Sequence, residues 1–555
     1  MGMFNYFTTI SLLLYQVAAT STPTAQTLNG TYSGLYSQSF NQDFFLGIPY
    51  LQAPVGNRRF HPADSLTSAW NGTVAATSYA PSCVGYDTSV DVSEMAEDCL
   101  YLNVIRPHAV SDSAKLPVVV FLHGGGFWGG SASESRYNLS YIVDQSTKLG
   151  QPILAISFNY RLSAWGFMYS NEVRDTGATN IGLRDQRFAL AWIQENIAGF
   201  GGDPAKVTLW GQDAGASSIG FQITAYEGRN DSLLRAAIME SGNPTPIQGL
   251  NGTQYYQPMY DAIVQRVSPS AAYAAENGMS GSNTCFEATD RMNCLRNVSF
   301  SDINEAINST NPRGWFPVID GNIVTQQASR SLFTKKYLGV PIILGANTDE
   351  GSFYMPDSKI TTDAEFVDLI TNPQSYNVAP GIALPKVLVN QLAKAYSNVS
   401  SSPYIKAKIY QSDATINANR RQACQVYAKA GIPTYCYRFN VPVSGHFTAQ
   451  HGDELPYVFN NAQSYVSDKS RAQLATDMTS SWVSFIATLD PNAWKNKTNA
   501  SASSVTPTWP RYVYGNAREM VFDEDGKSHV ESDNWRVTQV SLINGPSGIA
   551  VAYQR

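Results

Sequence analysis

Short apolar runs rich in β-branched residues, separated by segments with helical periodicity, constrain the fold of this chain most strongly. The runs are Leu116–His123, Pro152–Tyr160, Val207–Trp210, Ala236–Met239, Val340–Leu344 and Thr434–Phe439. Between the second and third runs, the apolar residues of Leu183–Ile197 recur near helical spacing. Strands that are apolar throughout and alternate with helices indicate a mostly parallel, doubly wound sheet. The sequence therefore predicts the α/β class.

The domain organisation and the compartment follow from the rest of the pattern. No linker interrupts the 555 residues, so we expect a single domain over residues 21–555, with long insertions at about Asn243–Lys336 and Tyr354–Gln422. Residues 1–20 resemble a secretory signal peptide, because an apolar stretch from about Tyr6 to Val17 precedes small residues. That stretch is shorter than the roughly 20 residues that span a bilayer. We expect a secreted, extracellular protein without stable membrane association.

The composition restricts the classes of molecule that this chain is expected to bind. The net charge is −6, only 15% of residues are charged, and no run of Lys or Arg occurs, so nucleic acid is not an expected partner. We expect a small-molecule substrate and neither metal nor cofactor, since cysteine and histidine do not cluster at zinc-ligand spacing.

Two kinds of motif support secretion. N-x-S/T sequons, the acceptors for N-glycosylation, occur at Asn29, Asn71, Asn138, Asn230, Asn251, Asn297, Asn308, Asn398, Asn496 and Asn499. The 6 cysteines are an even number, which favours disulfides outside the cell. Their spacing suggests the pairs Cys83–Cys99, Cys285–Cys294 and Cys424–Cys436, although other connectivities fit and the third pair is also compatible with two buried thiols.

Two glycine-containing turns after apolar runs carry the candidate chemistry. In His123-Gly124-Gly125-Gly126-Phe127, consecutive glycines let backbone N–H groups point into a pocket, as in an oxyanion hole; ordinary tight turns have the same composition. The second turn, Gly211-Gln212-Asp213-Ala214-Gly215, has the G-x-S-x-G form of a nucleophile elbow, with Asp213 where serine is expected.

Longer blocks carry a resemblance to a known family. They read EDCLYLNV at Glu97–Val104, NYRL at Asn159–Leu162, NIGLRDQ at Asn180–Gln186, NIAGFGGDP at Asn196–Pro204, ESG at Glu240–Gly242 and FPVIDG at Phe316–Gly321. On these blocks the chain resembles the type-B carboxylesterase/lipase family, which includes cholinesterases, secreted fungal lipases and catalytically silent adhesion proteins. The resemblance implies an α/β-hydrolase fold, with a large, mostly parallel central sheet flanked by helices.

The resemblance also implies a catalytic site. Asp349-Glu350-Gly351 matches the acid block of the family, and Gln450-His451-Gly452 begins its histidine block. The order nucleophile, acid, histidine along the chain is that of α/β hydrolases. The implied catalytic residues are therefore Asp213, Glu350 and His451, and the N–H groups of Gly125, Gly126 and Ala214 would form the oxyanion hole.

Aspartate at the elbow alters the expected chemistry. A carboxylate is a poor nucleophile toward an ester carbonyl, and its charge lies where the oxyanion develops, so we expect ordinary acyl-enzyme hydrolysis to be severely impaired. Ser217 and Ser218 lie too deep in the following helix to replace it.

Two other chemistries stay open for Asp213. Haloalkane dehalogenases and epoxide hydrolases use an elbow aspartate to attack carbon, but their next residue is usually Trp, where this chain has Ala214. Alternatively, two carboxylates that flank a protonated His451 would suit a lyase, an isomerase or a cyclisation.

The expected function combines these observations. The segment Val84–Asp98 occupies the place of the lipase lid but is short and acidic, so we expect no interfacial activation. Aromatic candidates for the pocket are Phe127, Trp128, Trp165, Trp315, Phe316 and Phe353, although core packing explains each of them as well. We expect a carboxylic ester hydrolase, with chemistry altered by Asp213, for a small apolar ester or lactone-like molecule, in a secondary-metabolite pathway. The alternative is a catalytically inactive, cholinesterase-like binding protein.

Overall fold

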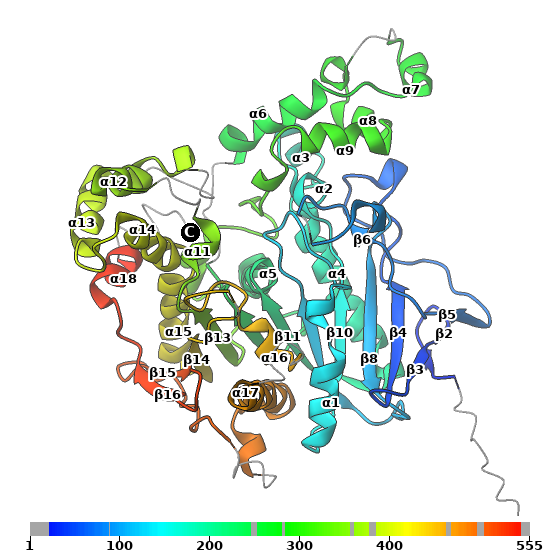
Figure 1. Ribbon diagram of the computed structural model, residues 1–555. Coiled ribbons are helices and arrows are strands. Elements are labelled where there is room, and N and C mark those ends of the chain that lie inside the picture. Colours follow the sequence, from blue (N-terminus) through cyan, green and yellow to red (C-terminus); the bar gives the residue numbers. More distant parts are fainter. Residues whose placement is uncertain are drawn as a thin grey trace, which may run out of the picture.

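A sheet of 11 strands forms the centre of this computed structural model (Figure 1). The strand order is β16-β15-β14-β13-β12-β11-β9-β10-β8-β4-β3. Neighbours from β10 to β15 are parallel, whereas β3, β4, β8 and β16 pair antiparallel at the edges. The strands are β3 (Leu35–Ser37), β4 (Gln42–Pro49), β8 (Tyr101–Pro107), β9 (Leu116–Leu122), β10 (Leu154–Phe158), β11 (Gly202–Gln212), β12 (Ala236–Glu240), β13 (Ile342–Asn347), β14 (Thr434–Phe439), β15 (Arg518–Phe522) and β16 (His529–Ser532). The predicted α/β class and mostly parallel sheet are confirmed.

The structure describes residues 22–87, 89–245, 252–279, 284–355, 360–376, 384–443, 445–461, 468–496 and 504–545. The expected signal peptide and the sequons at Asn251 and Asn499 lie outside the described residues. All six apolar runs coincide with strands β9 to β14, and Leu183–Ile197 coincides with helix α4 (Ile181–Asn196). The antiparallel edge strands were not predicted, because their alternating, half-buried patterns are weaker signals than the continuous apolar runs.

Strand β9 shows why helices cover both faces of the sheet. Side chains along a strand point alternately to opposite faces. Val119 and Phe121 belong to a cluster with α1 (Ser140–Lys148) and α17 (Lys469–Thr488). Residues 118, 120 and 122 join a second cluster with α4, α5 (Ala214–Thr224) and α15 (Ala418–Lys429). The strand is therefore apolar throughout because neither face meets water.

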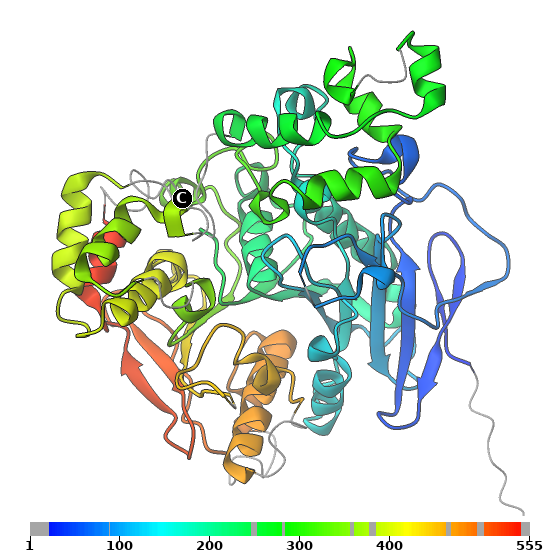
Figure 2. The same ribbon diagram turned by 45° about the horizontal axis from the view of Figure 1, so that its top comes forward.

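The insertions form two helical groups beyond the sheet. One holds α6 (Gly252–Val264), α7 (Ala271–Glu276), α8 (Arg291–Arg296) and α9 (Phe300–Asn308); the other holds α12 (Asp363–Thr371), α13 (Lys386–Tyr396), α14 (Pro403–Ser412) and α18 (Val537–Asn544). Figure 2 shows the first group at the top and the second at the left of the sheet. The second group packs around its own apolar cluster. None of the helices in the described ranges combines the length and apolar character that a membrane crossing requires.

Shorter elements complete the described chain. They are β1 (Thr24–Gln26), β2 (Thr31–Ser33), β5 (Thr73–Ala75), β6 (Ser82–Cys83), β7 (Met95–Ala96), α2 (Ser163–Phe167), α3 (Asn171–Asp175), α10 (Ala328–Phe333), α11 (Gly351–Tyr354) and α16 (Leu455–Val458). Disulfides join Cys83 to Cys99, Cys285 to Cys294, and Cys424 to Cys436.

Candidate active site

Asp213 stands in the sharp turn between β11 and α5. Its backbone has φ 55° and ψ −121°, a conformation that costs a non-glycine residue energy and persists only where the surroundings enforce it. The flanking glycines make the turn possible. A Cβ on Gly211 would lie 2.6 Å from the backbone of Gly215, and one on Gly215 would lie 1.9 Å from the carbonyl oxygen of Leu122. The strand-to-helix elbow expected from the sequence is therefore present, with a carboxylate at its tip.

The carboxylate of Asp213 lies in the expected oxyanion hole. Its Oδ2 accepts hydrogen bonds from the N–H groups of Gly125 at 3.0 Å and Gly126 at 2.8 Å. The N–H of Ala214 helps to lower the pKa of the same carboxyl. A side chain of the protein therefore occupies Gly125 and Gly126, two of the three donors inferred from the resemblance.

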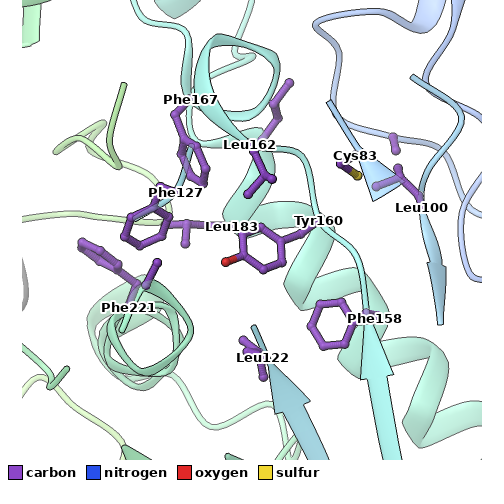
Figure 3. Packing of buried hydrophobic residues seen from close by; sticks show 14 of the residues in the cluster. Cys83, Leu100, Leu122, Phe127, Phe158, Tyr160, Leu162, Phe167, Leu183 and Phe221 are labelled. Atoms are coloured by element: carbon purple, nitrogen blue, oxygen red, sulfur yellow. The ribbon is translucent and has the colours of Figure 1, made fainter. Parts of the chain in front are cut away.

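Packing beneath the glycine turn holds these donors in place. Figure 3 shows Phe127 next to Phe167 and Phe221, above the end of the strand that carries Leu122. The rings of Phe127 and Phe167 lie 5.2 Å apart in an edge-to-face arrangement. The hydroxyl of Tyr160 donates to the carbonyl oxygen of His123 at 2.9 Å. A rigid layer therefore positions the N–H groups before any ligand arrives.

His451 bridges the elbow to Glu350. Its Nδ1–H donates to Glu350 Oε2 at 2.7 Å, and its Nε2 lies 3.4 Å from Asp213 Oδ1. Glu350 is fully buried, and its Oε1 accepts from the Ser241 hydroxyl at 2.7 Å and from the Asn347 N–H at 2.6 Å. These bonds fix the carboxylate of Glu350, which in turn fixes the imidazole plane, so the three residues inferred for catalysis come together.

Charge pairing dominates the electrostatics of the site. Burial alone would raise the pKa of the Asp213 carboxyl, but its hydrogen bond to His451, the charge of that residue and the backbone donors lower the pKa to about 2. Burial would lower the pKa of His451, yet the two carboxylates beside the ring raise it well above its usual value. The resting site is therefore an imidazolium between two carboxylates at neutral pH.

A cavity of 340 Å³ opens in front of this ion pair. Its lining comprises Asp87, Ser89, Gly125, Gly126, Trp128, Arg136, Gln212, Asp213, Arg313, Phe353, His451 and Gly452. Phe353 is 59% exposed and packs against the ring of His451 at 4.9 Å. Of the six aromatic candidates, Trp128 and Phe353 line the cavity, while the other four are buried in side-chain packing. Two arginines make the lining more polar than the sequence led us to expect.

The loop closed by Cys83–Cys99 forms a fixed wall of this cavity. The N–H of Tyr86 donates to the carbonyl oxygen of Trp128 at 2.7 Å. The Tyr86 hydroxyl donates to Asn304 at 2.7 Å and accepts from the indole N–H of Trp165 at 3.0 Å. Three hydrogen bonds thus fasten the segment that precedes Asp87 and Ser89.

Comparison with known proteins agrees with this geometry. The chain matches the model of the carboxylesterase family over residues 18–539. It is 31% identical to Secreted lipase 1 of Botryotinia fuckeliana over 90% of this chain and 88% of that protein. It is 34% identical to Lipase 4 of Diutina rugosa over 63% of this chain and 66% of that protein. The chain belongs to the carboxylesterase family.

Solved structures support the same fold for this carboxylesterase-family chain. EstA of Aspergillus niger superimposes with a TM-score of 0.78 at 24% identity, covering 95% of this chain and 98% of that one. A PNB esterase superimposes with a TM-score of 0.72 at 25% identity, covering 94% and 99%. The α/β-hydrolase fold is confirmed, and the chain is a member of a family of carboxylic ester hydrolases.

Sequence reasoning missed several contributors to the carboxylesterase site. Gln212 places its side-chain amide 3.2 Å from His451 Nε2. Ser241 and Asn347 hold Glu350, and Arg136 and Arg313 line the cavity. The ESG block was the only signal for Ser241, and Gln212 is the variable position of the elbow motif; the other three come from segments with no recognisable motif.

Proposed function

We propose that the protein is a secreted hydrolase of a small ester or lactone-like molecule in which Asp213 attacks the alkyl carbon of the substrate. The observation that carries this proposal is the placement of the two carboxylate oxygens. Oδ2 occupies the oxyanion hole, while Oδ1 faces His451 at the cavity. An ester carbonyl that approached this site would find its stabilising donors already taken.

Displacement at carbon needs no free oxyanion hole in its first step. Asp213 Oδ1 forms a bond to the alkyl carbon, and the bond from that carbon to the ester oxygen breaks, so that a carboxylate leaves with the electron pair. Arg136 and Arg313 line the same cavity and would bind such an anion. Asp213 is now a neutral ester, so His451 has lost one of its two anionic partners and gives its proton to the departing acid.

The second step uses the site as a normal esterase site. Neutral His451, held by Glu350, removes a proton from water, which attacks Cγ of Asp213. The developing charge on Oδ2 lies on the N–H groups of Gly125 and Gly126, which already bind that oxygen in the resting protein. The Cγ–Oδ1 bond then breaks, so that Oδ1 leaves in the alcohol, which takes the proton from His451. The new carboxyl of Asp213 gives its proton to His451, which restores the resting ion pair.

Isotope placement tests this mechanism. A single turnover of β-butyrolactone with excess protein in ¹⁸O-water should leave the label in the peptide that contains Asp213, with none in the product. Acyl cleavage would instead put the label in the carboxyl group of the product and leave Asp213 unlabelled, which would refute the proposal. The variant His451→Gln should accumulate the alkyl ester on Asp213, because water is no longer activated, while Asp213→Asn should form no adduct.

One observation favours a second candidate, a binding protein without catalysis. A carboxylate that occupies its own oxyanion hole and pairs with His451 is a stable resting state. This alternative predicts neither label nor adduct in these experiments, together with saturable ligand binding that survives in His451→Gln.

Secretion, glycosylation and the choice of a small substrate belong to the same proposal. The described sequon asparagines at positions 29, 71, 138, 230, 297, 308, 398 and 496 all retain solvent exposure, which is what a glycosylated surface requires. The name of the Botryotinia fuckeliana relative supports an extracellular location. The short, fastened loop at Tyr86 favours a soluble metabolite in a biosynthetic pathway over an emulsified lipid.

A further inference from the structure

A group of fully buried polar side chains lies behind the Glu350–His451 pair. It consists of Glu240 at the end of β12, Tyr437 on β14 and Glu454, which precedes α16, and each is 0% exposed. None of them reaches the cavity in front of Asp213. Buried carboxyl groups are costly unless they are paired or protonated, so their state requires an explanation.

Strand register brings Glu240 and Tyr437 together. Glu240 pairs with Gly345 on β13, and Gly345 pairs with Tyr437 on β14, so the three residues form one row across the sheet. Residues in such a row share a face of the sheet. A Cβ on Gly345 would lie 1.8 Å from the Tyr437 ring. The ring therefore crosses β13 through the space that this glycine leaves, toward Glu240.

Glu454, the third buried side chain, connects this row to the catalytic acid Glu350. Glu454 Oε2 accepts from the side-chain amide of Asn347 at 2.5 Å. The backbone N–H of the same Asn347 donates to Glu350, and its amide also reaches the carbonyl oxygen of Gln450, next to His451. Glu454 thus orients a residue that holds both members of the catalytic pair.

Both glutamates have one carboxyl oxygen without a hydrogen-bond donor among the described residues. Glu240 Oε1 accepts from the indole N–H groups of Trp210 at 2.7 Å and Trp482 at 2.5 Å. Within the described ranges, Glu240 Oε2, Glu454 Oε1 and the hydroxyl of Tyr437 have no hydrogen-bond partner. If both glutamates were ionised, each would keep a buried, negatively charged oxygen that no donor of the described chain satisfies. A proton on either carboxyl turns one of these oxygens into a donor.

The surrounding charges favour the same state. Burial and the negative charge of Glu350 raise the pKa of Glu454 to about 7, although the amide of Asn347 and the charge of His451 act in the opposite direction. Burial and the charge of Glu454 raise the pKa of Glu240 well above its usual value. The positive charge of Arg420 opposes the rise in the pKa of Tyr437, but Arg420 itself donates hydrogen bonds to Glu519 and Asp533.

From this arrangement we infer that Glu240 and Glu454 hold one proton between them, as a positioning device for Glu350 and His451. When the proton is present, the two glutamates together carry one negative charge behind Glu350. When the proton is lost, they carry two. Loss of the proton therefore increases the field that binds the proton of His451 and weakens the acidity of that imidazolium. The inference does not depend on where Asp213 attacks.

Infrared spectroscopy tests the shared proton on the intact protein. At about pH 8 exposed Asp and Glu are ionised, so the carbonyl stretch of a protonated carboxylic acid reports only buried acids. We expect such a band in the wild-type protein, shifted in D₂O, and its complete loss in the double variant E240Q/E454Q. The matched control is E519Q, which removes another buried acid whose pKa is raised to about 7, and which should keep the band.

Two results would overturn the inference: absence of the band from the wild-type protein at this pH, or its persistence in the double variant. The single variants E240Q and E454Q identify which carboxyl carries the proton. A separate readout of positioning is the Nδ1 proton resonance of His451, which E454Q should move and E519Q should leave unchanged. No movement in E454Q would show that the pair does not act on His451.

Discussion

Replacing Asp213 with serine should convert the protein into an ordinary esterase. The exchange frees the N–H groups of Gly125 and Gly126, which now bind Oδ2, and puts a hydroxyl within reach of His451 Nε2, which lies 3.4 Å from Oδ1. One oxyanion-hole donor contributes about 10²–10³ in rate. Two freed donors therefore predict a gain of about 10⁴-fold or more in kcat/KM, equivalent to about 5.5 kcal/mol of transition-state stabilisation.

Hydrolysis of p-nitrophenyl acetate by wild type, Asp213→Ser and Asp213→Ala measures this gain. The alanine variant frees the same donors without a nucleophile, so the difference between the two variants isolates the hydroxyl. Adding His451→Ala to the serine variant should abolish most of the gain, because the hydroxyl loses its base. Equal activity of the serine and alanine variants would refute the reasoning, since it would show that His451 and Glu350 cannot activate a nucleophile at the elbow.

Three further predictions concern the ion pair, the sheet and the loop. Asp213, with its pKa lowered to about 2, stabilises the fold above about pH 4, and this contribution of about 2 kcal/mol is lost as the pH falls toward 2. The raised pKa of His451 adds stability that is fully present below about pH 6.5 and is lost as the pH rises through the folded value. Asp213→Asn should therefore flatten the pH dependence of the melting temperature on both limbs, and an unchanged profile would contradict the ion pair. Gly345→Ala should lower the free energy of unfolding by about 1–3 kcal/mol, because the Cβ of the alanine collides with the ring of Tyr437. Denaturant unfolding measures this change, and an unchanged free energy of unfolding would show that the ring can move aside. Hydrogen bonds fasten the Cys83–Cys99 loop, so the rate at which Asp213→Ser hydrolyses tributyrin should rise smoothly as the tributyrin concentration passes its solubility limit. A sharp increase in rate at that concentration would indicate a lid that opens.

The sequence predicted the central strands because a strand that is buried on both faces has a continuous run of apolar residues. Thr434–Phe439 coincides with β14 at both ends, and Ala236–Met239 falls one residue short of β12. The missing residue, Glu240, has an acidic side chain, which ended the apolar run in the sequence although this side chain is fully buried. Two indole donors and a raised pKa make that burial possible, and both come from the tertiary structure.

The sequence also identified the catalytic residues, but for a different reason. Asp213 and the glycine turn follow strands, and the glycines are required by the close approach of backbone to backbone. Motif blocks of the family then pointed to Glu350 and His451. Arg136 and Arg313 carry no such signal, since only the folded chain brings the two loops that hold them to one cavity.

By itself, the sequence determined the α/β class, the elbow and the identity of the residue at its tip, because periodicity and glycine requirements are local. The tertiary structure decided what that residue does at rest. Only the fold places the carboxylate of Asp213 on the N–H groups of Gly125 and Gly126 and opposite His451. It also puts Glu240 beside Glu454, although 214 residues separate them in the chain. The energies of charges depend on distance and burial, and neither quantity can be read from positions along the chain.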